Sequence, residues 1–174
     1  YKAGNQNWGI QQHDNGWIYV ANNKGLLEFD GVEWNTYPIH NAKTRAVKVG
    51  HDGRIYIGGM EQFGYFTPNR LGGLEYTCLS DSLSPNVNVG VIWNILLDGD
   101  RVYFQSDRRF FYWEEGAVKK IDYSSEIYTS FVLRDQLYIT SAEGLLMLNG
   151  TEFRSVLGPL GIGATVKVGG LLPH

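Results

Sequence analysis

The sequence predicts an all-β protein built from β-propeller blades. Three observations support this prediction: a composition rich in glycine and aromatic residues, a repeat of four similar units, and turn dipeptides between short strands. Glycine accounts for 22 of 174 residues and aromatic residues for 14%, whereas average glycine usage is about 7%. Because glycine supplies tight turns and aromatic side chains favour strands, the composition indicates many short strands joined by turns.

A repeated tyrosine marks the four units. Each copy lies in a short apolar stretch that follows a turn: Tyr19, Tyr56, Tyr103 and Tyr138. Their spacings are 37, 47 and 35 residues, close to the period of about 40–45 residues of four-stranded propeller blades. We therefore place approximate blades at residues 8–39, 45–79, 91–122 and 129–157.

Each unit is a strand, a turn, a strand, a polar loop, a strand, a turn and a final strand. Asp-Gly or Asn-Gly, the dipeptides that suit tight hairpins because those turns need positive φ, occur at positions 30–31, 52–53, 98–99 and 149–150. The second strand of the first unit, Trp17–Val20, is apolar on both faces. Two apolar faces are expected when neighbouring blades cover the strand on both sides.

The tail at residues 161–172 is predicted to be the start of a further blade. Four blades and a stub do not obviously close a ring, so we interpret residues 1–174 as one partial propeller domain. Open strand edges need a cover. The remaining blades of the same protein, or a homodimer partner, are the expected partners.

Charge and cysteine content argue against several classes of protein. The net charge is −3 with mixed signs and no polybasic stretch, so no nucleic-acid contact is expected. The longest apolar run, residues 89–97, is far shorter than the ~20 residues that span a bilayer. Cys78 is alone, which excludes a disulfide framework and a cysteine zinc site. No cofactor is predicted.

The first turn and the strands after it resemble a known repeat. The residues concerned are Asp14-x-Gly16-x-Ile18-Tyr19 and Gly25-Leu26-Leu27-x-Phe29-Asp30. They resemble the two-component regulator propeller repeat, and residues 5–66 are similar to the N-terminal sensor region of Bacteroidetes hybrid two-component and triple-tyrosine-domain membrane regulators. The resemblance implies a periplasmic sensor, the extracytoplasmic part of an inner-membrane protein whose cytoplasmic output is a kinase or a DNA-binding domain. It also implies that the protein contacts the membrane only through a downstream segment.

No catalytic residue and no metal site is predicted. The histidines lack the close companions of a metal site. Most carboxylates fall in turns, where Asp accepts hydrogen bonds from its own backbone. The alignment of the repeats places Asp14 and Asp52 at the same turn position. No Gly-x-Ser-x-Gly element is present.

The candidate ligand-binding residues lie where inner strands begin. Trp8 and Trp93 open the inner strands of the first and third units, and Arg45 holds the equivalent place in the second. Such positions lie near the channel mouth of a propeller, where an aromatic ring and an arginine suit a carbohydrate or another small ligand. Glu61 and Gln62 lie on a loop and are weaker candidates. The alternative is that the tryptophans simply pack between blades.

Three functions remain open. The leading hypothesis is a non-catalytic, extracytoplasmic ligand-sensing module of a two-component-type signal transduction or transcription regulator. The second is a glycan-active enzyme propeller, a lyase or hydrolase, which requires converging carboxylates or a Tyr/His/Arg cluster. The third is a protein-interaction scaffold.

Overall fold

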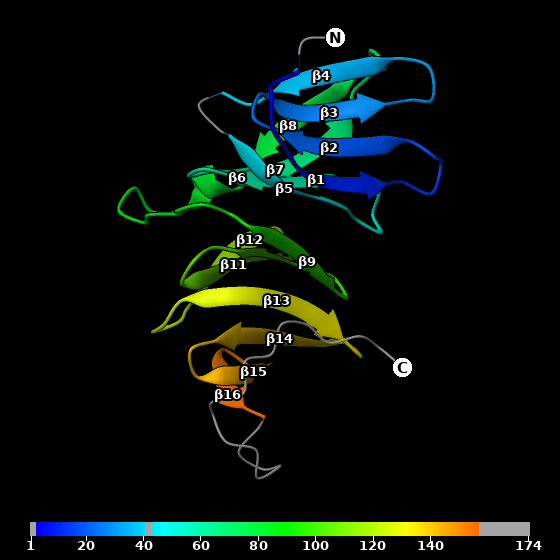
Figure 1. Cartoon of the computed structure of the whole chain (residues 1–174). Coiled ribbons are helices and arrows are strands. Elements are labelled where there is room, and N and C mark those ends of the chain that lie inside the picture. The colour runs from blue at the N-terminus through cyan, green and yellow to red at the C-terminus, as the bar shows by residue number, and fades with distance from the viewer. Residues whose placement is uncertain (1–2, 41–42, 157–174) are drawn as a thin grey trace. The chain divides into compact units, whose positions relative to one another are not determined.

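The computed structural model describes residues 3–40 and 43–156, and these residues form four antiparallel four-stranded sheets (Figure 1). In every sheet, strands that are consecutive in sequence pair with each other, so each sheet is an up-and-down meander. The all-β prediction is confirmed, with one 3-10 turn, η1 (Ser80–Ser82), among the described residues. The further blade predicted at residues 161–172 lies outside them.

The four sheets follow one another along the chain. The first contains β1 (Asn7–Gln12), β2 (Ile18–Asn22), β3 (Gly25–Phe29) and β4 (Trp34–Pro38). The second contains β5 (Thr44–Val49), β6 (Ile55–Gly59), β7 (Phe63–Pro68) and β8 (Leu74–Cys78). The third contains β9 (Asn94–Asp98), β10 (Arg101–Gln105), β11 (Arg109–Glu114) and β12 (Ala117–Asp122). The fourth contains β13 (Ile127–Leu133), β14 (Gln136–Ser141), β15 (Gly144–Asn149) and β16 (Glu152–Ser155).

The chain divides into two compact units, residues 1–95 and 96–174. In the first unit, β5 of the second sheet lies against β1 and β2 of the first. Buried side chains from both sheets form one core, which includes Tyr19, Leu26, Val47, Ile57 and Phe66. Apolar surface is thus buried between two meanders, which is how propeller blades stabilise each other.

The second unit has its own core. Tyr103, Phe110 and Ile121 of the third sheet pack with Leu137 and Ile139 of the fourth. The second strands of the repeats, such as β6 and β10, are buried almost throughout, as their two apolar faces predict. A polar second face would have been left in water.

The turns have the expected backbone geometry. The glycines of the four predicted dipeptides have φ values between 56° and 100°, the region where a Cβ is disfavoured. The hairpin between β13 and β14 has no glycine, and Arg134 and Asp135 take φ values of 52° and 57° instead. Non-glycine residues in this region store strain.

Candidate functional site

Trp8, Arg45 and Trp93, the three principal candidates, come together in the first unit. The Arg45 guanidinium carbon lies 4.1 Å from the centroid of the Trp8 ring. The rings of Trp8 and Trp93 meet edge to face, with centroids 6.4 Å apart and planes at 67°. We refer to these three residues as the Trp8–Arg45–Trp93 cluster.

Two β-bulges place the first two members of the cluster. The register between β1 and β2 shifts at Asn7/Gly9, and that between β5 and β6 shifts at Thr44/Ala46. Trp8 and Arg45 are therefore the extra residues of equivalent bulges. A bulge changes the direction in which a side chain points and is frequent beside binding sites.

Asn23 holds the cluster in place from the turn between β2 and β3. Its Oδ1 accepts a hydrogen bond from Arg45 Nη1 at 2.7 Å and another from Trp8 Nε1 at 3.1 Å. Its Nδ2 donates to Gln6 Oε1 at 3.0 Å. Since one amide oxygen binds both side chains, the guanidinium is fixed over the indole face, which strengthens their cation–π contact.

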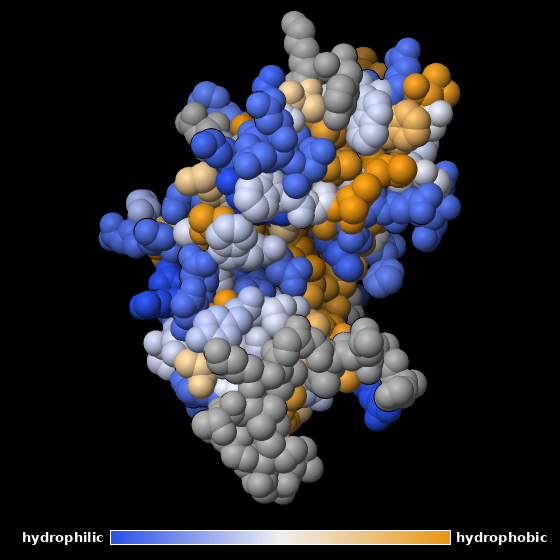
Figure 2. Space-filling view, viewed as in Figure 1, coloured by the Kyte–Doolittle hydropathy of each residue, from blue (hydrophilic) through white to orange (hydrophobic). Residues whose placement is uncertain are grey.

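The cluster faces solvent. The exposed fractions are 45% for Trp8 and 46% for Trp93, so part of each tryptophan is accessible. Figure 2 shows hydrophobic surface beside hydrophilic surface over the β1–β4 sheet. An exposed indole pair next to a guanidinium can stack on the apolar face of a sugar ring and donate hydrogen bonds to its oxygens.

Glu61 and Gln62 have a different local role. Glu61 has a φ of 57°; its backbone N–H donates to Gly90 O at 2.8 Å, and its Oε2 accepts from Val89 N at 3.2 Å. Met60 also forms a bridge with Val91. These bonds tie the β6–β7 turn to the segment that leads into Trp93. The Gln62 Oε1 is buried and accepts no hydrogen bond from any described residue.

Sequence reasoning missed Asn23 and a fourth inner-strand position. Tyr128, 58% exposed, is the bulged residue of β13, where the register shifts at Ile127/Thr129. The inner-strand positions can be recognised by their distance in sequence from the repeat tyrosine. Trp8 and Arg45 precede their repeat tyrosines by 11 residues, and Trp93 and Tyr128 precede theirs by 10. Each sheet thus offers an aromatic or arginine side chain at this position.

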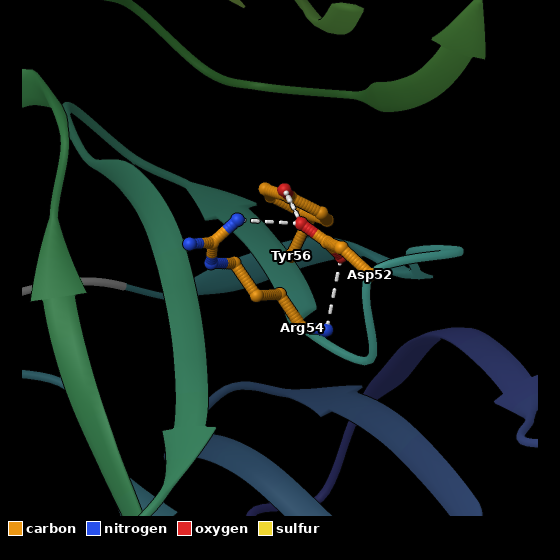
Figure 3. A network of polar contacts seen from close by, with 3 residues as sticks. All are labelled: Asp52, Arg54 and Tyr56. Atoms are coloured by element: carbon orange, nitrogen blue, oxygen red, sulfur yellow. Dashed lines mark hydrogen bonds and ion pairs between the residues drawn. The ribbon is translucent and has the colours of Figure 1, made fainter. Parts of the chain in front are cut away.

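A second polar arrangement belongs to the second sheet (Figure 3). Asp52 Oδ2 accepts hydrogen bonds from Tyr56 Oη at 2.8 Å and Arg54 Nη1 at 2.6 Å, and Oδ1 accepts from the Arg54 backbone N–H at 3.0 Å. Burial acts to raise the pKa of Asp52, but these bonds and the Arg54 charge outweigh it and lower that pKa. The Arg54 guanidinium also lies over the Tyr65 ring at 4.9 Å. All charges in this network are paired, which fits a structural role.

In the described part of the chain, no three His, Cys, Asp or Glu side chains are grouped so that they could hold a metal ion. Within the same residues, no helix has the length and apolar character needed to cross a bilayer.

Four-stranded meanders whose inner strands are buried on both faces define the class of fold: these sheets are β-propeller blades. No family model matches the chain, and no curated protein matches it. Several solved structures have a similar fold. A virginiamycin B lyase from Staphylococcus aureus has a TM-score of 0.69 and 14% identity over 87% of this chain and 55% of its own. The extracellular domain of BT4673 from B. thetaiotaomicron, a proposed one-component system, has a TM-score of 0.65 and 14% identity over 86% of this chain and 21% of its own.

A third similar structure is the extracellular domain of the proposed hybrid two-component system BT3049 from B. thetaiotaomicron, with a TM-score of 0.57 and 12% identity over 82% of this chain and 21% of its own. The chain therefore spans about half of the lyase and about a fifth of the two extracellular domains. Identities this low show the fold alone. Extracellular domains of Bacteroides two-component systems, the class that residues 5–66 resemble, are among the structures that share it.

Proposed function

We propose that this chain is a ligand-sensing propeller segment of a two-component-type signalling protein, located in the periplasm. The observation that carries the proposal is the Trp8–Arg45–Trp93 cluster, a solvent-facing pair of indoles with a guanidinium held between β1 and β5 by Asn23. Fold similarity to extracellular sensor domains supports it. Sensors of this kind work by binding a ligand that favours one of two signalling states.

The ligand class that fits the cluster is a carbohydrate, and an anionic one most of all. Two indoles provide faces for the C–H surface of a sugar ring, and Arg45 provides a fixed positive charge and planar donors for a carboxylate or sulfate. Glu61 and Gln62 contribute indirectly, because their turn is bonded to the segment that carries Trp93.

A glycan array followed by calorimetry on the whole chain tests this function. With any glycan that binds, Trp8→Ala and Arg45→Ala should each weaken affinity at least tenfold, because each removes a direct contact. Trp34→Ala is the matched control, since Trp34 is a partly exposed tryptophan of the same sheet that stacks on Phe29. Glycan binding that survives both cluster variants would refute the assignment.

The second candidate is an enzyme propeller, because a lyase shares the fold with a TM-score of 0.69. Turnover of a polysaccharide or of virginiamycin B by the wild-type chain, lost on substitution of a carboxylate or histidine, would favour this candidate over the sensor. A protein-interaction scaffold is the third, and the expected partners, the remaining blades or a second copy, stay predictions.

A further inference from the structure

Arg45 differs from the other half-buried arginines in how its charge is treated. Among the described residues, the half-buried arginines are Arg45, Arg54 and Arg109. Arg54 pairs with Asp52 at 2.6 Å, and Arg109 pairs with Asp122 at 3.3 Å. Arg45 forms no ion pair with any residue that the structure describes. Its positive charge is therefore not neutralised within this part of the chain.

Both oxygen atoms that orient Arg45 belong to neutral groups. Nη1 donates to Asn23 Oδ1 at 2.7 Å and to the backbone oxygen of Thr44 at 3.1 Å. The third contact is the uncharged Trp8 ring, whose centroid lies 4.1 Å from the guanidinium carbon. These contacts fix the guanidinium and leave its full charge. A charged donor that is already held in place loses little freedom when it binds an anion.

The hydrogen bonds of Arg45 use one end of the guanidinium and leave one edge of it. Nε and Nη2 donate to none of the described residues. The N–H groups on this edge form a planar fork that matches the two oxygens of a carboxylate. Trp8 Nε1, in contrast, already donates to Asn23 Oδ1 at 3.1 Å. Trp8 therefore offers a ligand its ring, and Arg45 offers the donors.

The first sheet keeps its own carboxylates away from Arg45. Glu28 on β3 is only 3% exposed, and its Oε1 accepts a hydrogen bond from Tyr37 Oη at 3.0 Å. Asp30 Oδ1 accepts from two backbone N–H groups of its own turn, at 2.8 and 2.7 Å. The first sheet contains no arginine of its own, since Trp17 stands where the second sheet has Arg54. Each of these carboxylates is thus held by groups other than a guanidinium.

We propose that the Trp8–Arg45–Trp93 cluster selects a sugar that carries a carboxylate, a uronic acid, and that Asn23 is the residue that sets this selectivity. The carboxylate accepts from Nε and Nη2 of Arg45, while an indole face of the cluster contacts the sugar ring. Asn23 matters because its amide oxygen holds Arg45 without cancelling its charge, whereas an aspartate would hold the same groups and cancel it. This inference rests on the proposed carbohydrate function and names the ligand's charged group.

An NMR titration of the whole chain tests the selectivity with two matched probes, methyl β-D-glucuronide and methyl β-D-glucoside. The two sugars differ only at C6, which is a carboxylate in the first and a hydroxymethyl group in the second. At pH 7 and constant ionic strength, tryptophan indole N–H signals should shift with an affinity at least tenfold higher for the glucuronide. Equal affinities, or no shift with either sugar, overturn the proposal.

Three variants assign the selectivity to Asn23. Asn23→Asp should lower the ratio of the two affinities at least fivefold, because the new carboxylate pairs with Arg45. Asn15→Asp is the matched control: it makes the same charge change in the β1–β2 turn, where Oδ1 accepts from Trp17 N at 2.9 Å, and should keep the wild-type ratio. Arg45→Gln should bring the ratio close to one, which keeps the test valid if Asn23→Asp does not fold.

The outcomes separate this inference from the function on which it rests. A wild-type ratio that survives Asn23→Asp overturns the role of Asn23. Neutral glycans that bind through Trp8 and Arg45 on the array, together with equal affinities for the two probes, overturn the uronic acid selectivity and leave the carbohydrate function standing.

Discussion

Replacing Asp52 by alanine removes the acceptor of three hydrogen bonds in the second sheet (Figure 3). Tyr56 is only 1% exposed, and a buried hydroxyl that loses its acceptor costs about 1–3 kcal/mol. The turn bond to the Arg54 backbone N–H contributes about 0.5–1.5 kcal/mol. The Arg54 ion pair is about a third exposed on each side, so solvent screening limits it to about 0–1 kcal/mol. Asp52→Ala should therefore lower the free energy of unfolding by about 1.5–5.5 kcal/mol.

The pH dependence of this loss identifies the carboxylate as its source. The folded pKa of Asp52 is lowered, because the hydrogen bonds and the Arg54 charge outweigh burial. Its stabilisation is therefore fully present above the unfolded pKa of about 3.9 and is lost as the pH falls through the lower folded pKa. The difference between the wild type and Asp52→Ala should shrink as the pH falls below about 4.

Urea unfolding followed by circular dichroism and tryptophan fluorescence measures both effects. Asp52→Asn is the matched control, because its amide oxygen can still accept from the Arg54 backbone N–H, as Asn15 Oδ1 accepts from Trp17 N at 2.9 Å in the first sheet. It should lose about half as much stability as Asp52→Ala. A difference that stays constant into acid, or an alanine variant as stable as the wild type, would refute the reasoning.

Two further predictions concern the second unit. Phe110 is fully buried and packs against Tyr103 and Phe153, with ring centroids 6.2 and 5.7 Å away. Phe110→Ala should therefore lower the free energy of unfolding, measured by urea denaturation, by about 3–5 kcal/mol. A loss below about 1 kcal/mol would contradict this packing. Arg134 has a φ of 52°, so Arg134→Gly should raise the thermal midpoint by relieving about 1 kcal/mol of strain, whereas a lower midpoint would mean that the side chain itself stabilises the hairpin.

The sequence predicts the fold well because the propeller repeat is encoded locally. Strands with two apolar faces and Asp-Gly or Asn-Gly turns recur at a steady period, and each signal needs only a few neighbouring residues. The alignment of Asp14 with Asp52 is wrong, however. Gln12 pairs with Ile18, and Val49 pairs with Ile55, so Asn15 holds the place of Asp52. The glycine of the turn marks the equivalent position, because the backbone requires it, while the side chain before it varies.

The candidate site is predictable only in part. Alignment of the repeats identifies Trp8, Arg45 and Trp93 as residues at the starts of inner strands. The structure places these residues in contact. Asn23 and Glu28 give no such signal. Whether a carboxylate on β3 is buried depends on a sheet formed by residues far along the chain, and the amide of Asn23 gains its role only once β1 and β5 are adjacent. Long-range packing of this kind is not visible in a local pattern.

Differences among the repeats distinguish the first sheet from the second and third. In the second and third sheets, arginine, carboxylate and tyrosine satisfy one another, as the Arg54–Asp52 and Arg101–Glu114 pairs show, and paired groups have little left to offer a ligand. The first sheet lacks the arginine but keeps a buried carboxylate, and its bulged Trp8 faces solvent beside Arg45. The fold does not require an indole at the Trp8 position, and the proposed carbohydrate site is the role that we assign to it.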